Sequence, residues 1–270
     1  MRSCSIRRFR KYRAVFQMEV QYSLRYRANT LFYLSSVILP VVLQYFLWTT
    51  VFRDQRQVGP YDLSAMLTYY TVAVFLSHLR LFAWWDIGYA IKDGRMALHL
   101  VRPWNPFLLY LVRALAWTSS AFLLLLLAYL PLVFGLLHTH LRAPASPQAL
   151  LWMLLFWFLG GLFTYTVGYL VNLLAFWTEG VTGILWLLAF LEEFLSGALV
   201  PLNLLPGSSW WIHQPFAFLG YLPARIYLGQ ASGAELAEAL GILLGVLAGL
   251  IPLAQAVFQR GLRGYQPAGG

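Results

Sequence analysis

Among the long stretches of this sequence that contain no charged side chain, one lies near each end of the chain. The first covers residues 28–52 and the second covers residues 239–259, so they are 25 and 21 residues long. A helix needs about 20 apolar residues to cross the hydrocarbon core of a bilayer. The whole sequence is 60% hydrophobic and 11% charged, whereas soluble domains carry about 25% charged residues. The chain is therefore expected to be an all-α integral membrane protein.

Six apolar segments have the length of membrane spans. Their expected bounds are Leu31–Phe52, Leu63–Trp85, Ala114–Leu137, Leu150–Phe176, Val181–Val200 and Ala239–Phe258. None of them shows the alternation of polar and apolar residues that membrane β-barrels need. We expect one membrane domain over residues 1–270, in which residues 1–30 lie at the inner surface, residues 31–258 form the six spans and residues 259–270 form a tail.

The distribution of Lys and Arg predicts the orientation of these spans. Six spans place fourteen Lys and Arg residues on the side of the two termini and four on the opposite side. Cytoplasmic loops concentrate these residues, so both termini are expected in the cytoplasm. Arg80 falls near the inner end of the second span, and its side chain is expected to reach the membrane interface.

The segment before the first span has a helical pattern. Apolar residues recur at steps of three and four, with basic residues between them: Phe9, Tyr12, Phe16, Val20 and Leu24. This pattern predicts an amphipathic helix that lies in the inner interface and binds anionic lipid. The alternative is a basic flank that only sets the topology.

The segment from Trp84 to Pro106 is too polar for lipid and too apolar for a plain linker. Gly94 is well placed to end one short helix, and Pro103 to stop a second one. Two short, half-apolar helices facing the cytosol suggest a docking element. A simple connection between spans explains the pattern equally well.

A third irregular segment runs from Ser196 to Gly233 and is rich in proline. It begins with Gly197 and Pro201, which predict the end of the fifth span near the outer face. An extended loop would leave backbone groups unpaired in lipid, so short re-entrant or interfacial helices are expected. In the last span, Gly241, Gly245 and Gly249 form a repeat that allows another helix to approach closely. Packing within the same subunit is the simpler expectation, and a subunit interface is the alternative.

Four polar residues stand out inside the spans: Gln44, Asn172, Glu192 and Glu193. A carboxylate at mid-membrane costs about 2.5–3.5 kcal/mol, so it normally faces protein or a water-filled cavity. Adjacent residues of a helix point about 100° apart, so Glu192 and Glu193 are not expected to face one partner. One is predicted to line a pathway and the other to brace the outer helices. Alternatively, the fifth span is short and both lie at a wet outer rim.

The sequence lacks the motifs of common catalytic sites. No phosphate-binding loop is present, since neither of the two lysines, Lys11 and Lys92, follows a glycine. Paired histidines at helical spacing and the G-x-S-x-G motif of serine hydrolases are also missing. The chain is therefore not expected to be an enzyme by itself or to hold a cofactor or metal.

Several motifs in their joint order resemble one family. These are DIGYAIKDGRMALHLVRP between the second and third spans, FLSGALVPLNLLPG after the fifth and the terminal RGLRGYQPAGG. Together they resemble the six-span bacterial permeases of the ABC-2 type, and the resemblance covers nearly the whole chain. The tail differs slightly, because Ala268 stands where the family usually has valine.

The resemblance implies a subunit of an ATP-driven exporter in the bacterial cytoplasmic (inner) membrane. Two permease chains, identical or paralogous, would form a dimer with twelve helices, and two separate ABC ATPase subunits would bind ATP and Mg in the cytoplasm. The segment between the second and third spans would hold the coupling helix. The residues expected to couple to the ATPase are Asp86, Ile87, Lys92, Gly94, Arg95 and Arg102. Those expected at the pathway or outer gate are Gln44, Asn172, Glu192, Glu193, Gly197 and Pro201.

Two other functions compete with this interpretation. An ion-coupled secondary transporter would have interrupted helices in both halves of the chain, and the sequence indicates only one interrupted region, in the second half. An intramembrane lipid-modifying enzyme would use Glu192 and Glu193 as its acid and base. The sequence names no cargo.

Overall fold

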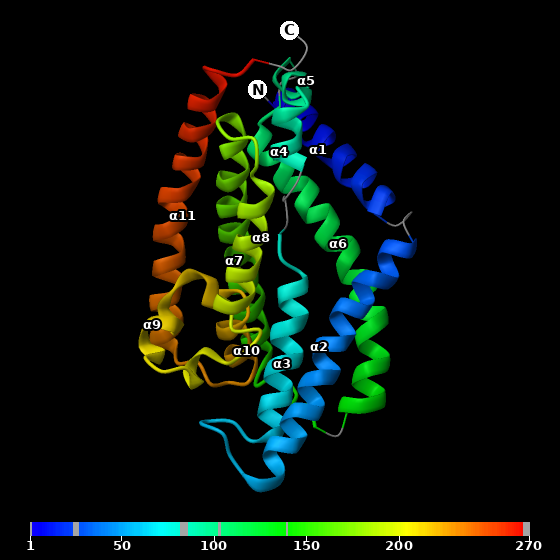
Figure 1. The fold of residues 1–270 in the computed structure, drawn as a ribbon, viewed down its shortest axis with the longest axis vertical. Coiled ribbons are helices and arrows are strands. Elements are labelled where there is room, and N and C mark those ends of the chain that lie inside the picture. The colour runs from blue at the N-terminus through cyan, green and yellow to red at the C-terminus, as the bar shows by residue number, and fades with distance from the viewer. Residues whose placement is uncertain (1, 24–26, 82–85, 102–103, 139, 267–270) are drawn as a thin grey trace.

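The computed structural model of the chain describes residues 2–23, 27–81, 86–101, 104–138 and 140–266. Side chains are described for residues 10–23 and, within those ranges, from residue 35 onward. The regular elements of this part of the chain are helices, arranged as an elongated bundle (Figure 1). The all-α prediction is confirmed.

Four helices are long and apolar enough to cross a membrane. They are α2 (Arg27–Asp54), α6 (Pro106–Leu132, continued by the π-helical turn η1, Val133–Leu137), α7 (Pro147–Leu173, continued by the 3-10 turn η2, Leu174–Phe176) and α11 (Gly233–Leu262).

Three of these helices, α6, α7 and α11, begin earlier than expected and have capped first turns; in α7 the Ser146 hydroxyl accepts from the Ala149 backbone N–H. The Asn105 side chain accepts a hydrogen bond from the backbone N–H of Leu108 at the start of α6. Ser232 and Glu235 form a reciprocal capping box at the start of α11. Each cap satisfies backbone donors that the first turn of a helix leaves unpaired.

The second and fifth predicted spans are shorter helices than expected. The structure has α3 at Leu63–His78 and α8 at Thr182–Leu195, of 16 and 14 residues. At 1.5 Å per residue they are about 24 and 21 Å long, against about 30 Å of hydrocarbon. Figure 1 shows α3 in the half of the bundle away from the termini, whereas α8 starts near the termini and ends partway along. The expected bounds Leu63–Trp85 and Val181–Val200 are therefore wrong as single helices.

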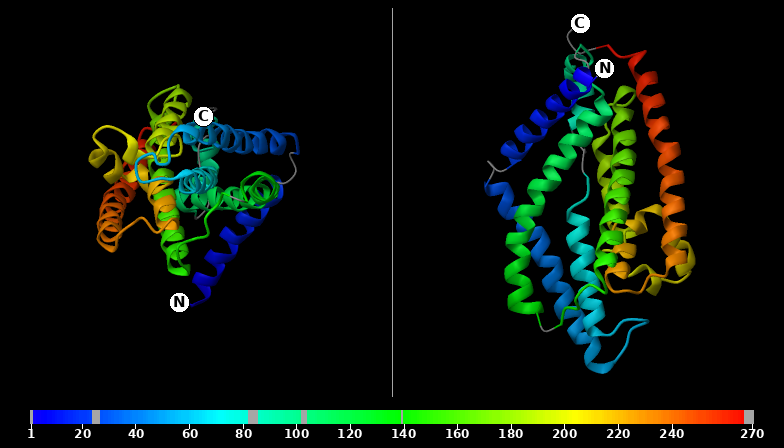
Figure 2. Two further views of the ribbon diagram at one scale, coloured as in Figure 1. Left: turned by 90° about the horizontal axis from the view of Figure 1, so that it is seen from below. Right: turned by 180° about the vertical axis from the view of Figure 1, so that it is seen from behind.

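The end of the bundle that carries both termini also carries three smaller elements. Helix α1 (Arg2–Ser23) runs obliquely along α6, and α4 (Asp86–Lys92) and α5 (Arg95–Val101) lie beside it (Figures 1 and 2). A helix before the first span is confirmed, while its position in a membrane interface stays a prediction. Of its expected apolar face, Phe9 and Leu24 lie outside the described side chains.

The segment of residues 196–232, called here the Pro-rich segment, folds into four short helices against α3 and α7. They are η3 (Leu202–Leu204), α9 (Ser208–His213), η4 (Pro215–Phe218) and α10 (Tyr221–Tyr227). A core of buried aromatic residues, including Tyr61, Tyr69, Phe156 and Tyr221, fixes this segment to the bundle. A second core, around Ile87, Tyr165 and Phe258, lies under α4.

Candidate functional site

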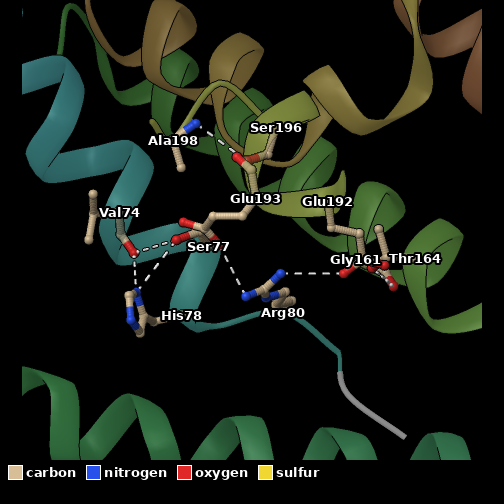
Figure 3. A network of polar contacts seen from close by, with 10 residues as sticks. All are labelled: Val74, Ser77, His78, Arg80, Gly161, Thr164, Glu192, Glu193, Ser196 and Ala198. Atoms are coloured by element: carbon tan, nitrogen blue, oxygen red, sulfur yellow. Dashed lines mark hydrogen bonds and ion pairs between the residues drawn. The ribbon is translucent and has the colours of Figure 1, made fainter. Parts of the chain in front are cut away.

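One arginine joins the two glutamates of α8. Arg80 Nη1 lies 3.3 Å from Glu192 Oε2, and Arg80 Nη2 lies 3.2 Å from Glu193 Oε2. Figure 3 shows the guanidinium between the two carboxylates. The prediction that the adjacent glutamates would not face one partner is wrong, because the two nitrogens of the planar fork reach both. Arg80, Glu192 and Glu193 are called the ion triad below.

The backbone around Arg80 explains its direction. Helix α3 ends at His78, and the next three residues are not helical. Leu79 has φ −95° and ψ 16°, so the chain turns directly after the helix. Leu79 and Leu81 are both buried, each in a different hydrophobic cluster, and Arg80 between them reaches α8. The Thr118 hydroxyl of α6 donates to the Arg80 carbonyl at 3.0 Å and holds this segment. The expectation that Arg80 extends to the interface is therefore wrong.

The two glutamates differ in their surroundings. The Glu192 side chain is 3% exposed, whereas that of Glu193 is 29% exposed. With all three groups ionised, the triad has a formal charge of −1, since one cation faces two anions. Charges attract more strongly in a medium of low dielectric constant, and a buried charge without a partner is costly. Glu192 therefore depends on Arg80 more than Glu193 does.

The chain after α8 is held by long-range hydrogen bonds. Gly197 has φ +79°, and a Cβ placed there would lie 2.8 Å from Tyr69 Oη and 2.9 Å from Tyr221 Cβ. The Tyr69 hydroxyl donates to the Gly197 carbonyl at 2.8 Å. Glycine is required here by both its backbone conformation and the close approach. Pro201 then directly precedes η3.

Helices α4 and α5 meet at Gly94, as the sequence predicts. Gly94 has φ +73°, which glycine adopts without strain. Helix α4 has one buried face and one exposed face. Ile87 is fully buried, whereas Asp86 and Lys92 are exposed. Arg95, at the start of α5, is exposed and pairs with Asp93 at 3.0 Å. Arg102, which the sequence also predicts to couple, lies outside the described residues.

Asn172 lies under α4. Its Oδ1 accepts a hydrogen bond from the Gly88 backbone N–H at 3.0 Å, and its Nδ2 donates to the Gly168 carbonyl at 2.8 Å. The structure thus brings Asn172 to the predicted coupling segment. Gln44, another polar residue expected at the pathway, accepts from Trp48 Nε1 one turn along α2 at 2.8 Å.

An ion-pair cluster that the sequence did not indicate links α4 to two other helices. Arg113 of α6 lies 2.6 Å from Glu19 of α1 and 3.0 Å from Asp86 of α4. Arg113 is 94 residues from Glu19 and 27 residues from Asp86 in the sequence, so local sequence patterns do not indicate the cluster. The signal available was that Arg113 directly precedes the third predicted span, in a segment of the chain that also contains Asp86.

The C-terminal tail packs on η2. A Cβ at Gly261 would clash with the Phe176 ring, and the Tyr265 ring centroid is 5.5 Å from that of Phe176. Burial raises the pKa of the Tyr265 phenol. The Gly and Tyr of the terminal motif therefore both fit against one aromatic ring.

The glycine repeat of α11 faces open space. A Cβ at Gly241, Gly245 or Gly249 would meet no atom of the described residues within 4 Å. The expectation that this repeat packs within the same subunit is wrong for the described part of the chain. No group of three or more His, Cys, Asp or Glu side chains that would hold a metal ion is found among the residues that the structure describes.

A comparison with known protein families identifies the family of the chain. Residues 38–269 match the profile of the family described as ABC-2 family transporter protein. None of the curated proteins compared with the chain matches it. The matched range contains the ion triad, α4, α5, the Pro-rich segment and most of the tail. The chain therefore belongs to the ABC-2 family of transporter proteins, as a membrane component of an ABC transporter and not an enzyme itself.

Proposed function

We propose that the chain is the permease of an ATP-driven exporter and that two such chains form its translocation pathway. In this proposal α2, α3, α6, α7, α8 and α11 are six spans, and both termini lie in the cytoplasm of a bacterium. The placement of both termini and of α4 and α5 at one end of the bundle supports this topology (Figure 1). The excess of Lys and Arg at that end supports a cytoplasmic location.

The observation that carries the proposal is the two-sided character of α4 and α5. Ile87 is fully buried and Gly88 is bonded to Asn172, so α4 is fixed to the bundle. Helix α5 instead leaves Leu98 and Val101 65% and 86% exposed. Exposed apolar residues on a short helix at a polar end of the molecule are typical of an interaction site. We assign this surface to a soluble ABC ATPase subunit.

The contacts of α4 with other helices give a route by which movements of the ATPase subunits would reach the membrane helices. Arg113 of α6 connects Asp86 of α4 with Glu19 of α1; α1 packs along α6, whereas α4 packs on α7 and η2. Closure of two ATPase subunits around ATP would displace α4 and α5, and packed helices transmit such displacements as rigid bodies. ATP binding shifts the equilibrium between two conformations only through contacts that differ between them. The Asp86–Arg113 contact is the one we expect to differ.

Replacement of Gly94 or Asp86 tests this coupling. Gly94→Ala strains a residue at φ +73°, and Asp86→Asn removes a charge from the Arg113 pair. We expect both variants to insert normally but to lose most export and most cargo-stimulated ATPase activity in the copurified complex. Gly241→Ala, where a Cβ has open space, is the matched control. Unchanged coupling in both variants contradicts the proposal.

One observation favours an ion-coupled secondary transporter as the second candidate. The sequence indicated a single interrupted region, but α3 and α8 both end partway along the bundle, so each half of the chain has an interruption. Ionisable groups lie at the point where they meet. Proteoliposomes of the chain alone distinguish the two functions. Uptake driven by a pH gradient supports the second candidate, whereas a requirement for ATPase subunits and ATP supports the first.

A further inference from the structure

A pocket of about 340 Å³ lies at the end of the bundle that carries the termini, apart from the ion triad. Its walls are the start of α6, one turn of α7 and the last turns of α11, and the rear view shows α7 between α6 and α11 (Figure 2). The lining residues are Trp104, Asn105, Pro106, Phe107, Tyr169, Gln255, Phe258 and Gln259. Its volume is within the range of pockets that hold small molecules, about 300–1,000 Å³.

The floor of the pocket is aromatic and carries one unpaired hydroxyl. Tyr169 is 2% exposed, and its ring lies 5.2 Å from that of Phe107, centroid to centroid. Its hydroxyl has no hydrogen-bond partner in the part of the chain that the structure describes. The neighbouring Tyr165, in contrast, donates to the Phe107 carbonyl at 2.6 Å. Tyr169 Oη is not one of the fully buried atoms that lack a partner, so the hydroxyl keeps some accessible surface, and we expect a ligand or water in the pocket to bond it.

The wall formed by α11 supplies two more polar groups. Gln255 and Gln259 are four residues apart, so both lie on one face of the helix. Neither side-chain amide has a hydrogen-bond partner among the described residues. Each amide offers a donor and an acceptor. Together with the Tyr169 hydroxyl they form a set that matches hydroxyl or amide groups of a ligand.

Among the residues that the structure describes, no charged side chain lines the pocket. A phosphate, an ammonium group or a carboxylate would leave water without gaining a partner of opposite charge, which is unfavourable. The exposed part of Trp104 and the buried rings of Phe107 and Phe258 offer apolar faces instead. We propose that this pocket binds the uncharged, hydroxyl-bearing or amide-bearing head of an amphiphile. The inference relies on the proposed function only in placing the pocket at the cytoplasmic side of the membrane.

Such a ligand has two possible sources. It is either a membrane lipid with an uncharged polar head or an amphiphilic cargo that enters from the inner leaflet. Both share the chemistry that the pocket selects, namely hydrogen-bonding groups beside an apolar body. We expect the head of such a molecule to occupy the pocket while its tail stays in the bilayer.

Protection of an engineered cysteine tests the site. Gln259→Cys is made in a Cys4→Ser background, which removes the single native cysteine and leaves Gln255 and Tyr169 in place. Inside-out membrane vesicles that contain the complete transporter are treated with maleimide and dodecyl maltoside below its solubilising concentration. We expect the maltoside, which has an uncharged hydroxyl-rich head, to slow labelling at least threefold. Dodecylphosphocholine, which has the same tail and a zwitterionic head, should not slow it.

The matched control is Gln17→Cys in the same background, because Gln17 is an exposed glutamine of α1 that does not line the pocket. Its labelling should not respond to either detergent. Equal protection at both positions, equal protection by both detergents, or no protection by the maltoside overturns the proposal. The assay needs neither ATP nor transport. Copurification with an ATPase therefore judges the proposed function separately.

Gln259→Cys itself removes a lining residue of the pocket. Tyr169→Phe, added to that variant, gives a second measurement that changes a different lining residue. Loss of one hydrogen bond should raise the maltoside concentration for half protection about fivefold. Unchanged melting of the variant excludes a general loss of fold, and an unchanged half-protection concentration overturns the assignment. Lipids extracted from the purified wild type and from Tyr169→Phe identify the source. An uncharged polar lipid enriched only in the wild type marks a lipid site, and protection without such a lipid marks a cargo site.

Discussion

Helices α3 and α8 both end partway along the bundle, but their ends are held in different ways. At the end of α8 and just after it, four backbone carbonyls accept hydrogen bonds from residues that are distant in the sequence. These are Leu195 from Gln214 (2.6 Å), Ser196 from the Tyr221 N–H (2.7 Å), Gly197 from Tyr69 (2.8 Å) and Leu199 from Tyr70 (3.0 Å). At the end of α3, Ser77 and His78 bond the Val74 carbonyl of the same helix, and His78 also bonds the backbone of Ser36 in α2. Thr118 supplies a hydrogen bond from another helix.

The difference suggests a fixed end and a movable one. The end of α8 belongs to the aromatic core of the Pro-rich segment, so displacing it breaks several long-range contacts together. The end of α3 leads through Arg80 and Leu81 toward α4, which we propose to move with the ATPase. Arg80 is then the contact through which the movable end acts on the fixed one. The predictions below test this contrast, from the largest expected effect to the smallest.

Arg80→Gln should have the largest effect. It leaves Glu192 buried without its cation, and removal of one partner of a buried pair costs about 3–5 kcal/mol. We expect about 3 kcal/mol, because the Arg80 side chain is 21% exposed. Unfolding of the purified chain in SDS titrations measures it. The double variant Arg80→Gln/Glu192→Gln should recover much of this loss, and wild-type stability of the single variant would show that the pair is not buried as described.

Gly197→Ala should have the next largest effect, because it damages the fixed end. The added Cβ meets Tyr69 Oη and Tyr221 Cβ and places alanine at a positive φ. Strain of this kind costs about 1–3 kcal/mol. The same SDS titration measures it, and Gly241→Ala, with open space around the Cβ, should be neutral or slightly stabilising. Equal behaviour of the two variants would remove the argument that the end of α8 is tightly packed.

Thr118→Val should reduce stability by about 1 kcal/mol, the usual net value of one hydrogen bond. The valine keeps the shape of threonine and removes only the bond to the Arg80 carbonyl. Since this bond holds the movable end, we expect a larger loss of coupled ATPase activity than of stability. Ser119→Ala is the control, because that hydroxyl bonds the Leu115 carbonyl of its own helix. A similar effect on coupling in both variants would contradict a special role for Thr118.

Glu193→Gln should change stability least, by less than about 1 kcal/mol, since partly exposed ion pairs contribute little. Its partial exposure makes it the better candidate for contact with cargo. We therefore expect Glu193→Gln to change export, assayed across pH, more than it changes folding. Glu192→Gln should show the reverse order. If neither change alters export at any pH, the pair is a structural brace and does not line the pathway.

Much of the fold follows from local features of the sequence. Uncharged apolar runs indicate the long helices, and Gly94 separates α4 from α5 as expected. The lengths of α3 and α8 could not be predicted from the sequence, because hydropathy stays high where a helix ends inside an apolar segment. Leu79 and Leu81 are as apolar as the helix before them, yet each is buried in a different cluster and the chain is non-helical there.

The candidate site was only half predictable. Glu192 and Glu193 stand out as carboxylates in a span, but their partner is more than 110 residues away along the chain. A usable signal was present, because Arg80 is a cation inside one predicted span and the glutamates are anions inside another. The assumption that Arg80 would reach the interface concealed it. The residues around Asn172 in the sequence are apolar, and they gave no indication that its side chain would accept a hydrogen bond from the Gly88 backbone N–H.

In the proposed topology, the unequal charge of the ion triad would make the protein sensitive to voltage. One elementary charge that crosses a full membrane exchanges about 2.3 kcal/mol per 100 mV with the electric field. When Arg80, Glu192 and Glu193 are all ionised, any shift of the triad along the membrane normal moves a net negative charge through part of that field. An inside-negative potential then favours the state in which the triad lies closer to the outer surface. The resting potential of the cell would thus set the balance between two conformations even when no ion is transported.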